Sequence, residues 1–291
     1  MKAGICISGF ADEISSDFNE QLRVLGELGM KYLSLRSADG KGIAEYTAKE
    51  VERTLLPRLK ASGVSVSSLG SPIGKIPVED ETAFEEQCRT LETLCKIAEI
   101  LDCRYIRIFS FYIPEGKDPA EYHDIVIEKL NRFAAIAKEH DVVLIHENEK
   151  DIFGDTGERC CQILEAVGSD NFKAVFDFAN FVQCREDPKV CWGLLREHVA
   201  YIHIKDAVYD KNENVLCGTG DGKIAQILAE AICEEEYHGF LTLEPHLVLF
   251  DSLKDLEIAE ASDVIKEDKY SSGAEGFKAQ YHALEEILNQ L

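Results

Sequence analysis

The chain has 291 residues, 45% of them hydrophobic, and its 54 acidic and 31 basic side chains give a net charge of −23 with histidine neutral. A surface this acidic repels phosphate backbones and anionic membranes, so neither nucleic acid nor a membrane is an expected partner. The length and hydrophobic content suffice for one large α/β domain spanning residues 1–291.

Short runs rich in β-forming residues alternate along the chain with longer amphipathic stretches. The predicted strands are residues 3–8, 32–35, 64–69, 105–109, 142–146, 174–178, 199–205 and 240–243. A helical stretch follows each run. The clearest helices are residues 18–28, 84–101 and 120–137, a helix opening at Thr47 and running through Leu59 toward Gly63, and a final helix from about 274 to 291.

Capping signals mark three of the predicted helix starts. Asp17 and Glu20 are spaced as N-cap and third helical residue, and Thr47 and Glu50 form the same capping-box pattern. Asp118 precedes a proline, which is favoured at the first position of a helix.

Eight strands, each followed by a helix at a spacing of roughly thirty residues, predict a single (β/α)8 TIM barrel of the α/β class. The competing architecture is a doubly wound open sheet. No GxGxxG sequence follows the first strand, which weakens the dinucleotide-binding version of that alternative. The sequence therefore favours the barrel.

Residues 251–273 form the least regular part of the chain, acidic at first and then Ser-Ser-Gly. We expect an extended loop after the eighth strand that serves as a lid or as a subunit contact. The sequence does not choose between them, so a homo-oligomer stays an open expectation.

The cysteines and the N-terminus indicate the compartment. Ten cysteines are scattered without a CxxC pair in a chain too long to need disulfides, which predicts reduced thiols in a cytoplasmic protein. The first fifteen residues lack the apolar core of a signal peptide, and no apolar run reaches membrane-spanning length.

Four side chains able to bind a metal stand near the ends of four successive predicted strands. They are Glu147 in VVLIHENE, Asp177 in KAVFDFAN, His203 in VAYIHIKD and Glu244 in GFLTLEPH. A parallel barrel gathers its strand ends into one ring, so these residues would meet around one ion. Three carboxylates and one imidazole suit a single divalent cation such as Mn²⁺, Mg²⁺, Co²⁺ or Zn²⁺.

Each ligand candidate has an alternative explanation. Asp177 closes an apolar strand, where a buried acid needs a cation, but it also stands where a helix N-cap or a salt-bridged strand end would. His203 in an apolar strand would ordinarily be a hydrogen-bonded core residue, whereas Lys205 and Asp206 make this strand end polar on both faces. In both cases the sequence favours the ligand.

Glu147 and Glu244 form a pair, since each ends an apolar run and precedes further polar residues. Two carboxylates on opposite sides of a substrate can remove a proton from one face and return it to the other. The alternative is a pair of solvated strand-end charges. His146 beside Glu147 faces the helix layer and is predicted to be structural.

Four further residues of the same rim are candidates for substrate binding: Arg107, Asn180, Lys205 and His246. For Arg107 a salt bridge inside the barrel is an equal alternative. The glycine-rich segment 218–222 (GTGDG) precedes a helix and could present free amides to an anion, but an ordinary tight turn explains it better.

At HENE, VFDFAN, YIHIKD, LTLEPH and GTGDG the chain resembles the xylose-isomerase-like TIM-barrel superfamily of sugar and sugar-phosphate isomerases and epimerases. Ketose 3-epimerases of this superfamily hold one divalent metal with Glu, Asp, His and Glu from the fifth to eighth strands. The resemblance therefore implies that Glu147, Asp177, His203 and Glu244 are metal ligands, and that Glu147 and Glu244 are also the catalytic acid and base.

The chain departs from the epimerase pattern at two positions. Asn180 stands where those enzymes have a histidine, and Lys205 where they have an arginine, which puts any particular sugar specificity in doubt. The superfamily also includes inosose and dehydroshikimate dehydratases and endonuclease-IV-like repair enzymes. The repair enzymes need further histidine ligands on early strands, which this acidic chain lacks.

The sequence thus predicts a metal-dependent isomerase or epimerase of a polyhydroxylated carbonyl compound, acting by proton transfer through an enediolate. A lyase on the same scaffold, of the inosose or dehydroshikimate dehydratase type, is the alternative. A non-catalytic carbohydrate-binding protein and a nuclease are less favoured. The sequence does not name the substrate or say whether it is phosphorylated.

Overall fold

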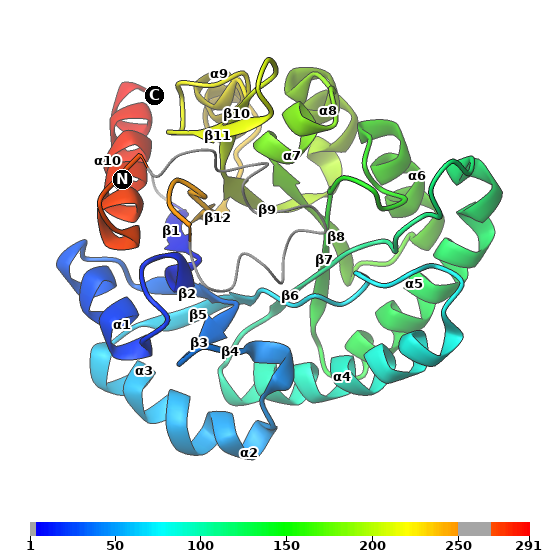
Figure 1. Cartoon of the computed structure of the whole chain (residues 1–291), viewed down its shortest axis with the longest axis horizontal. Helices are drawn as coiled ribbons and strands as arrows, with labels where there is room; N and C mark the ends of the chain where they lie inside the picture. The colour runs from blue at the N-terminus through cyan, green and yellow to red at the C-terminus, as the bar shows by residue number, and fades with distance from the viewer. Residues whose placement is uncertain (1–3, 250–268) are drawn as a thin grey trace.

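A barrel of eight parallel strands forms the centre of the molecule (Figure 1). The computed structural model describes residues 4–249 and 269–291. The strand order is β1-β12-β9-β8-β7-β6-β5-β2, and a bridge between Phe10 and Ser34 joins the two outer strands. The strands are β1 (Ile5–Gly9), β2 (Tyr32–Leu35), β5 (Ser65–Leu69), β6 (Tyr105–Ile108), β7 (Val143–Glu147), β8 (Phe172–Asp177), β9 (Val199–Ile204) and β12 (Gly239–Leu243).

These strands coincide with the eight predicted from the sequence, so the barrel prediction is confirmed. The boundaries differ at β8, where the predicted strand 174–178 begins two residues late and ends one residue late. Phe178 already belongs to the next helix, because Asp177 caps that helix through the backbone N–H of Asn180. A side chain at the strand end thus decides where the strand stops.

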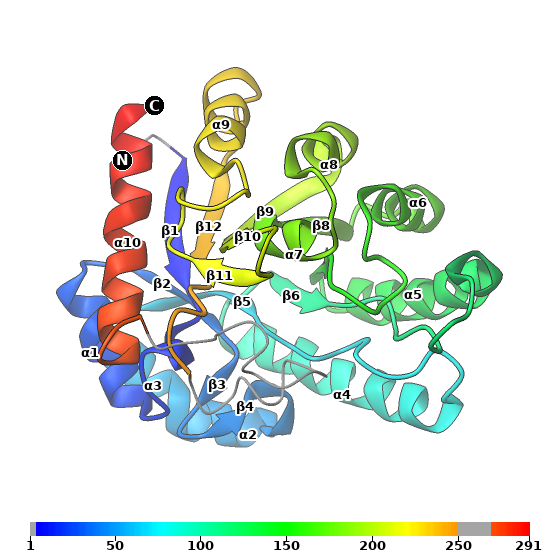
Figure 2. The ribbon, with the colours of Figure 1, turned by 45° about the horizontal axis from the view of Figure 1, so that its top comes forward.

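Helices surround the barrel on its outside (Figures 1 and 2). They are α1 (Phe18–Glu27), α2 (Ala48–Glu50), α3 (Leu56–Ser62), α4 (Glu81–Ile100), α5 (His123–Lys138), α6 (Gly157–Val167), α7 (Phe178–Gln183), α8 (Pro188–Leu195), α9 (Ile224–Ala229) and α10 (Gly273–Gln290). Short 3-10 turns occupy Ala11–Glu13, Ile43–Glu45, Pro119–Tyr122 and Arg196–His198, and π turns occupy Val51–Leu55 and Glu230–Glu234. Two small antiparallel pairs, β3 (Ser37–Ala38) with β4 (Lys41–Gly42) and β10 (Asp206–Val208) with β11 (Glu213–Val215), lie outside the barrel sheet.

The predicted capping residues lie at helix starts, with differences in detail. Thr47 and Glu50 form the complete capping box. Asp17 caps α1 through the N–H of Asn19, whereas Glu20 pairs with Arg23 and so takes no part in a box.

Two predicted helices begin or run differently from the sequence pattern. Asp118 caps a 3-10 turn, Pro119–Tyr122, and α5 starts only at His123 instead of residue 120. The helix expected from Thr47 to Leu59 is broken by the π turn Val51–Leu55. Pro57 follows this turn and has no N–H to donate to the preceding helical carbonyl, which accounts for the local change in hydrogen bonding.

The barrel interior is filled rather than hollow. Val143, Ile145, Val175 and Tyr201 form an apolar cluster on its inner face. The Tyr201 hydroxyl lies 2.8 Å from Ser67 Oγ and 2.6 Å from Thr242 Oγ1, so hydroxyl groups complete this layer. Asp177 is two residues beyond Val175 on β8, and His203 is two residues beyond Tyr201 on β9. Side chains two residues apart on a strand share a face, so both lie directly above this apolar cluster.

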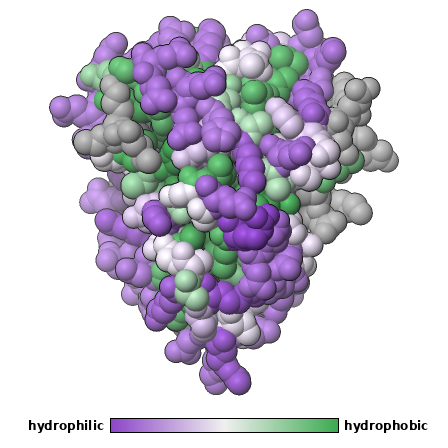
Figure 3. Space-filling model, turned by 90° about the vertical axis from the view of Figure 1, so that its left-hand side faces the viewer, coloured by the Kyte–Doolittle hydropathy of each residue, from purple (hydrophilic) through white to green (hydrophobic). Residues whose placement is uncertain are grey.

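Polar residues dominate the face of the molecule formed by α1 and α10 (Figure 3). On the side of α1 and α10, hydrophilic residues cover most of the face, and hydrophobic ones show only in patches between them (Figure 3). None of the described helices is both long and apolar enough to cross a membrane. Of the irregular segment 251–273, residues 251–268 lie outside the described part of the chain, and the remainder leads into α10.

Candidate metal centre

The four predicted ligands come together at the carboxyl end of the barrel. Glu147 and Asp177 are the last residues of β7 and β8, His203 lies one residue before the end of β9, and Glu244 directly follows β12. Asp177 pairs in register with His203, and His203 pairs with Thr242, two residues before Glu244. All four are buried, with at most 2% of their surface exposed.

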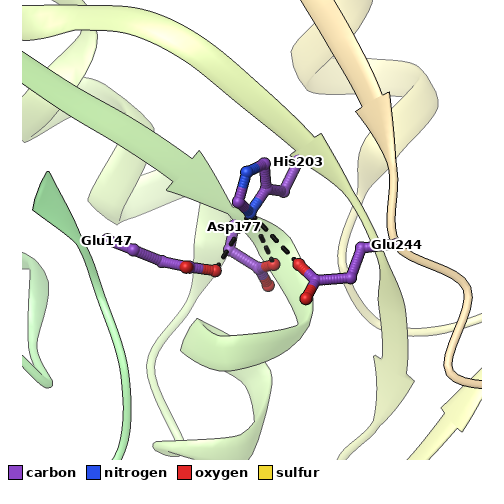
Figure 4. A group of neighbouring side chains, drawn as sticks. All are labelled: Glu147, Asp177, His203 and Glu244. Atoms are coloured by element: carbon purple, nitrogen blue, oxygen red, sulfur yellow. Dashed lines mark hydrogen bonds and ion pairs between the residues drawn. The ribbon is translucent and has the colours of Figure 1, made fainter. Parts of the chain in front are cut away.

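The side chains converge on one nitrogen atom (Figure 4). Nδ1 of His203 lies 3.0 Å from Glu147 Oε1, 3.1 Å from Glu244 Oε2 and 3.8 Å from Asp177 Oδ2. One ligand atom from each residue lies within 4.8 Å of all the others, the spacing of atoms that share one ion. Strands far apart in sequence therefore supply a compact set of three oxygens and one nitrogen.

The donor atoms fit a divalent cation. One oxygen of each carboxylate accepts no hydrogen bond from any described residue: Glu147 Oε2, Asp177 Oδ2 and Glu244 Oε2. A buried carboxylate oxygen without a hydrogen-bond donor is costly, and a cation bound among the three carboxylates would offset this cost. Carboxylate oxygens with a single imidazole nitrogen suit Mn²⁺, Mg²⁺, Co²⁺ or Zn²⁺, so this chemistry supports a divalent ion without selecting one.

The pKa values of the ligand side chains are shifted because these side chains are buried and lie close to other charged groups. Burial alone would lower the pKa of His203, but the Glu147 and Glu244 carboxylates outweigh it and raise the pKa to about 9. Burial would raise the pKa of Glu147, yet His203 and Arg107 bring it to about 2. For Asp177 burial prevails over the nearby Lys205 and raises the pKa to about 7.

Asp177 caps a helix with one oxygen and turns the other toward the cluster, so the two alternatives left by the sequence are compatible. Its Oδ1 accepts a hydrogen bond of 2.8 Å from the N–H of Asn180 and thereby caps α7. Its Oδ2 lies on the side of His203 and is 3.3 Å from Lys205 Nζ. The cap fixes the carboxylate plane, so the same residue can end the strand, start the helix and present one oxygen to the centre.

The structure places the four predicted substrate-binding residues beside the cluster, each already in contact with protein groups. Arg107 on β6 pairs with Glu147 Oε2 at 3.1 Å, so the salt bridge considered as an alternative is present. Asn180 donates to Asn148 O at 2.8 Å and reaches Glu147 Oε1 at 3.4 Å. Lys205 lies 3.7 Å from Glu244 Oε2.

His246, the fourth of these residues, lies on the flank of the centre. It is 3% exposed and adopts a left-handed backbone with φ 46°, which non-glycine residues rarely do. Its backbone N–H donates to Glu13 Oε2 at 2.7 Å, and its Nε2 is 3.5 Å from Glu244 Oε1.

The sequence interpretation missed the residues that follow β1 and β2. Arg36 directly follows β2 and contacts Glu244, Asp12 and Glu13, and Phe10 directly follows β1. The Phe10 ring is 5.1 Å from that of His203 and nearly perpendicular to it, which orients the imidazole from one side. Arg36 meets the criterion that identified the ligands, a charged side chain at the end of an apolar strand.

Glu13, Glu244 and His246 form a second group with ligand-like spacing. Arg36 already lies between the two carboxylates, 3.4 Å from Glu13 Oε1 and 2.9 Å from Glu244 Oε1. The guanidinium supplies the positive charge between these carboxylates. We therefore regard Glu13, Glu244 and His246 as the edge of the first centre and not as a second metal site.

The glycine-rich segment GTGDG is a tight turn. The N–H groups of Gly218, Gly220 and Gly222 each donate to the Asp206 carboxylate at 2.9 Å. The Asp206 carboxylate thus accepts the hydrogen bonds that these amides could otherwise donate to a bound anion.

A family model described as xylose isomerase-like TIM barrel matches residues 22–267. A comparison with curated protein sequences finds no match at a significant level.

Among solved structures the chain is similar to the IolI protein with a bound zinc atom, with 13% identity and a TM-score of 0.74 over 99% of this chain and 98% of that one. It is similar to D-allulose 3-epimerase from Methylomonas sp., with 16% identity, a TM-score of 0.73, and coverage of 99% and 98%. It is also similar to the probable 3-DHS dehydratase AsbF from Bacillus anthracis, with 15% identity, a TM-score of 0.72, and coverage of 96% and 98%. At these identities the likeness establishes a shared fold.

Proposed function

The chain belongs to the xylose isomerase-like TIM barrel family, and from this premise we propose that it is a divalent-metal-dependent isomerase or epimerase. Its substrate would be a sugar, a sugar phosphate or a related polyol ketone. The observation that carries the proposal is the convergence of Glu147, Asp177 and Glu244 on His203 Nδ1 at the carboxyl end of the barrel. Active sites of TIM-barrel enzymes lie at this end.

The proposed metal ligands are Glu147, Asp177, His203 and Glu244. When bound there, a divalent ion would polarise a substrate carbonyl and a neighbouring hydroxyl, which makes the adjacent C–H more acidic. The buried position of the four residues excludes water from the same place and strengthens every charge interaction.

The two glutamates are the proposed acid and base. One of Glu147 and Glu244 takes the proton from the carbon next to the carbonyl, and the other returns a proton to the opposite face. Each has one oxygen directed to His203 and a second oxygen beside an arginine, Arg107 or Arg36. Arg107, Asn180, Lys205 and His246 would hold substrate oxygens, since they surround the glutamates.

Solvent deuterium exchange tests the acid–base assignment. The wild-type chain, loaded with Mn²⁺, is incubated in D2O with ketoses, inososes and sugar phosphates, and deuterium in the substrate is measured by NMR. Glu147→Gln and Glu244→Gln should each abolish exchange, because glutamine cannot accept the proton. Glu99→Gln, an exposed glutamate paired with His140 on the outside of the barrel, is the matched control and should exchange like the wild type. Exchange retained in both site variants would refute the assignment.

A dehydratase is the second candidate, supported by the fold shared with the probable dehydratase AsbF and by the buried cation Lys205 beside Glu244. The same base would take the proton, and a hydroxyl on the next carbon would leave as water after receiving a proton from Lys205. Product mass separates the two functions, because a lyase product is lighter by one water molecule and an epimerase product has the substrate's mass.

A further inference from the structure

Arg36 is the most heavily engaged cation of the candidate centre. It directly follows β2 and is 5% exposed. Its Nη1 lies 2.9 Å from Glu244 Oε1, its Nε 2.8 Å from Asp12 Oδ2, and its Nη2 3.4 Å from Glu13 Oε1. One guanidinium therefore links the residues that follow β1, β2 and β12.

The contact divides the two oxygens of Glu244 between different partners. Oε1 accepts the hydrogen bond from Arg36, whereas Oε2 lies 3.1 Å from His203 Nδ1 and 3.7 Å from Lys205 Nζ. An arginine on Oε1 opposes rotation of the carboxylate and leaves Oε2 as the oxygen that faces the other ligands.

Arg36 is itself fixed on several sides. Asp12, which holds Nε, also accepts a hydrogen bond from the Ser37 hydroxyl at 3.3 Å. The guanidinium carbon lies 4.4 Å from the centre of the Phe10 ring. A Cβ at Gly70 would come within 2.6 Å of the Phe10 ring and 3.0 Å of Arg36 Cβ, so the absence of a side chain at Gly70 permits this packing. A lysine has a single nitrogen and lacks the planar fork that lets Nε, Nη1 and Nη2 of Arg36 contact three different carboxylates.

Glu147 is held differently. Arg107 Nη1 lies 3.1 Å from Glu147 Oε2, but this oxygen accepts no hydrogen bond from the described residues. The Arg107 Nε also lacks a partner among them. The two glutamates of the centre thus differ in how firmly the oxygen turned away from His203 is held.

We propose that Arg36 is a positioning residue that fixes Glu244 as a ligand through one oxygen, by holding Oε1 and leaving Oε2 directed at His203. The inference rests on the proposed function, because Arg36 can orient a metal ligand only if Glu244 binds a metal. Arg36 acts through Glu244 and Asp12 rather than on the substrate. Residues that orient metal ligands typically contribute a factor of about 10–100 to metal affinity.

Cobalt binding to the purified full chain tests this role without a substrate. Co²⁺ affinity is measured by calorimetry, the visible spectrum of bound Co²⁺ reports its ligand geometry, and circular dichroism checks folding. Arg36→Lys keeps the charge and should weaken Co²⁺ binding by about 10–100-fold and alter the visible spectrum. A purely structural arginine would lower the melting temperature and leave both readouts of the folded protein unchanged.

Arg58→Lys is the matched control. Arg58 pairs with Asp39 and lies 4.8 Å from the centre of the Phe18 ring, so it reproduces the carboxylate and ring contacts of Arg36 outside the centre. It should bind Co²⁺ like the wild type. Asp12→Asn loosens Arg36 without touching Glu244 and should weaken binding in the same direction by a smaller factor.

Three results would overturn the inference. Arg36→Lys that folds and matches the wild type in affinity and spectrum refutes it, and where Arg36→Lys does not fold, an Asp12→Asn variant identical to the wild type refutes it instead. A wild-type chain that binds no Co²⁺ refutes the proposed metal centre and the inference with it. Metal binding in the wild type therefore separates failure of the inference from failure of the proposed function.

Discussion

The acids and the imidazole of the centre lie at the ends of β7, β8, β9 and β12. Phe10 and Arg36 follow β1 and β2, and Arg107 lies on β6. We call these the ligand half and the arginine half of the barrel rim. The arginines lie on the far side of Glu244 and Glu147 from His203. The ligand half alone carries more negative than positive charge. The two arginines of the other half offset part of this negative charge in the metal-free protein.

Phe10 joins the two halves. Its ring lies 4.4 Å from the Arg36 guanidinium carbon, 5.2 Å from that of Arg107, and 5.1 Å from the His203 ring. An aromatic face favours cations, so the ring tolerates two guanidinium groups that would otherwise repel each other. Each arginine thus packs against the Phe10 ring and also forms an ion pair with a glutamate of the centre.

The largest effect is expected in the ligand half. Asp177→Asn keeps a side-chain oxygen that can cap α7, because asparagine caps helices as well as aspartate does. It removes one negative charge from the centre, so we expect divalent metal binding to fall by more than the roughly 10–100-fold typical of residues outside the ligand shell. Calorimetry with Mn²⁺ measures this loss.

Asp187→Asn provides the control for that variant. Asp187 caps α8 through the N–H of Lys189 and pairs with Lys223 at the surface. It should leave metal affinity unchanged. Equal affinities for Asp177→Asn and the wild type would remove Asp177 from the ligand half.

A smaller effect is expected in the arginine half and concerns stability. Arg107→Met removes the guanidinium beside the buried Glu147 carboxylate, which should lower the free energy of unfolding of the metal-free chain by about 3–5 kcal/mol. Adding Glu147→Gln should restore part of this loss, since the uncompensated charge is then gone. Urea unfolding of the single and double variants measures both changes.

Arg132→Met is the matched surface variant. Arg132 pairs with the half-exposed Glu85 and lies 5.2 Å from the centre of the Phe84 ring. Exposed ion pairs contribute at most about 1 kcal/mol, so its loss should be small. If Arg107→Met proves no more destabilising than Arg132→Met, the arginine half does not compensate the ligand half.

The smallest effect is expected at Phe10, where the two halves meet. Phe10→Leu keeps an apolar side chain but removes the aromatic face, and we expect a loss of about 1–3 kcal/mol in the free energy of unfolding. Phe18→Leu, beneath Arg58, should cost a similar amount. Only Phe10→Leu should change the visible spectrum of bound Co²⁺, and identical spectra for both variants would show that Phe10 merely fills space.

The sequence predicts the residues of the ligand half but not the role of Arg36 in the arginine half. The eight strands follow from apolar runs at regular spacing, and Glu147, Asp177, His203 and Glu244 stand out because each closes such a run. Arg36 closes the run 32–35 in the same manner, but its role depends on Glu244, which is 208 positions away in the sequence. No local pattern records that contact.

Two other details depended on tertiary contacts as well. The N–H groups of Gly218, Gly220 and Gly222 donate to the carboxylate of Asp206, twelve residues before Gly218, and so are not available to an outside anion. The sequence leaves Asp177 as either a ligand or a helix cap, and in the structure Oδ1 caps α7 while Oδ2 faces Lys205 and the cluster. Periodicity and spacing identify elements and residue types, whereas the orientation of single oxygens comes from the assembled barrel.

The central claim is that one divalent ion binds where the four strand ends meet. The most direct measurement is anomalous X-ray diffraction from crystals grown with Mn²⁺. One strong anomalous peak is expected within coordination distance of side-chain atoms of Glu147, Asp177, His203 and Glu244. A strong peak elsewhere, or no peak at these four residues at saturating Mn²⁺, would contradict it.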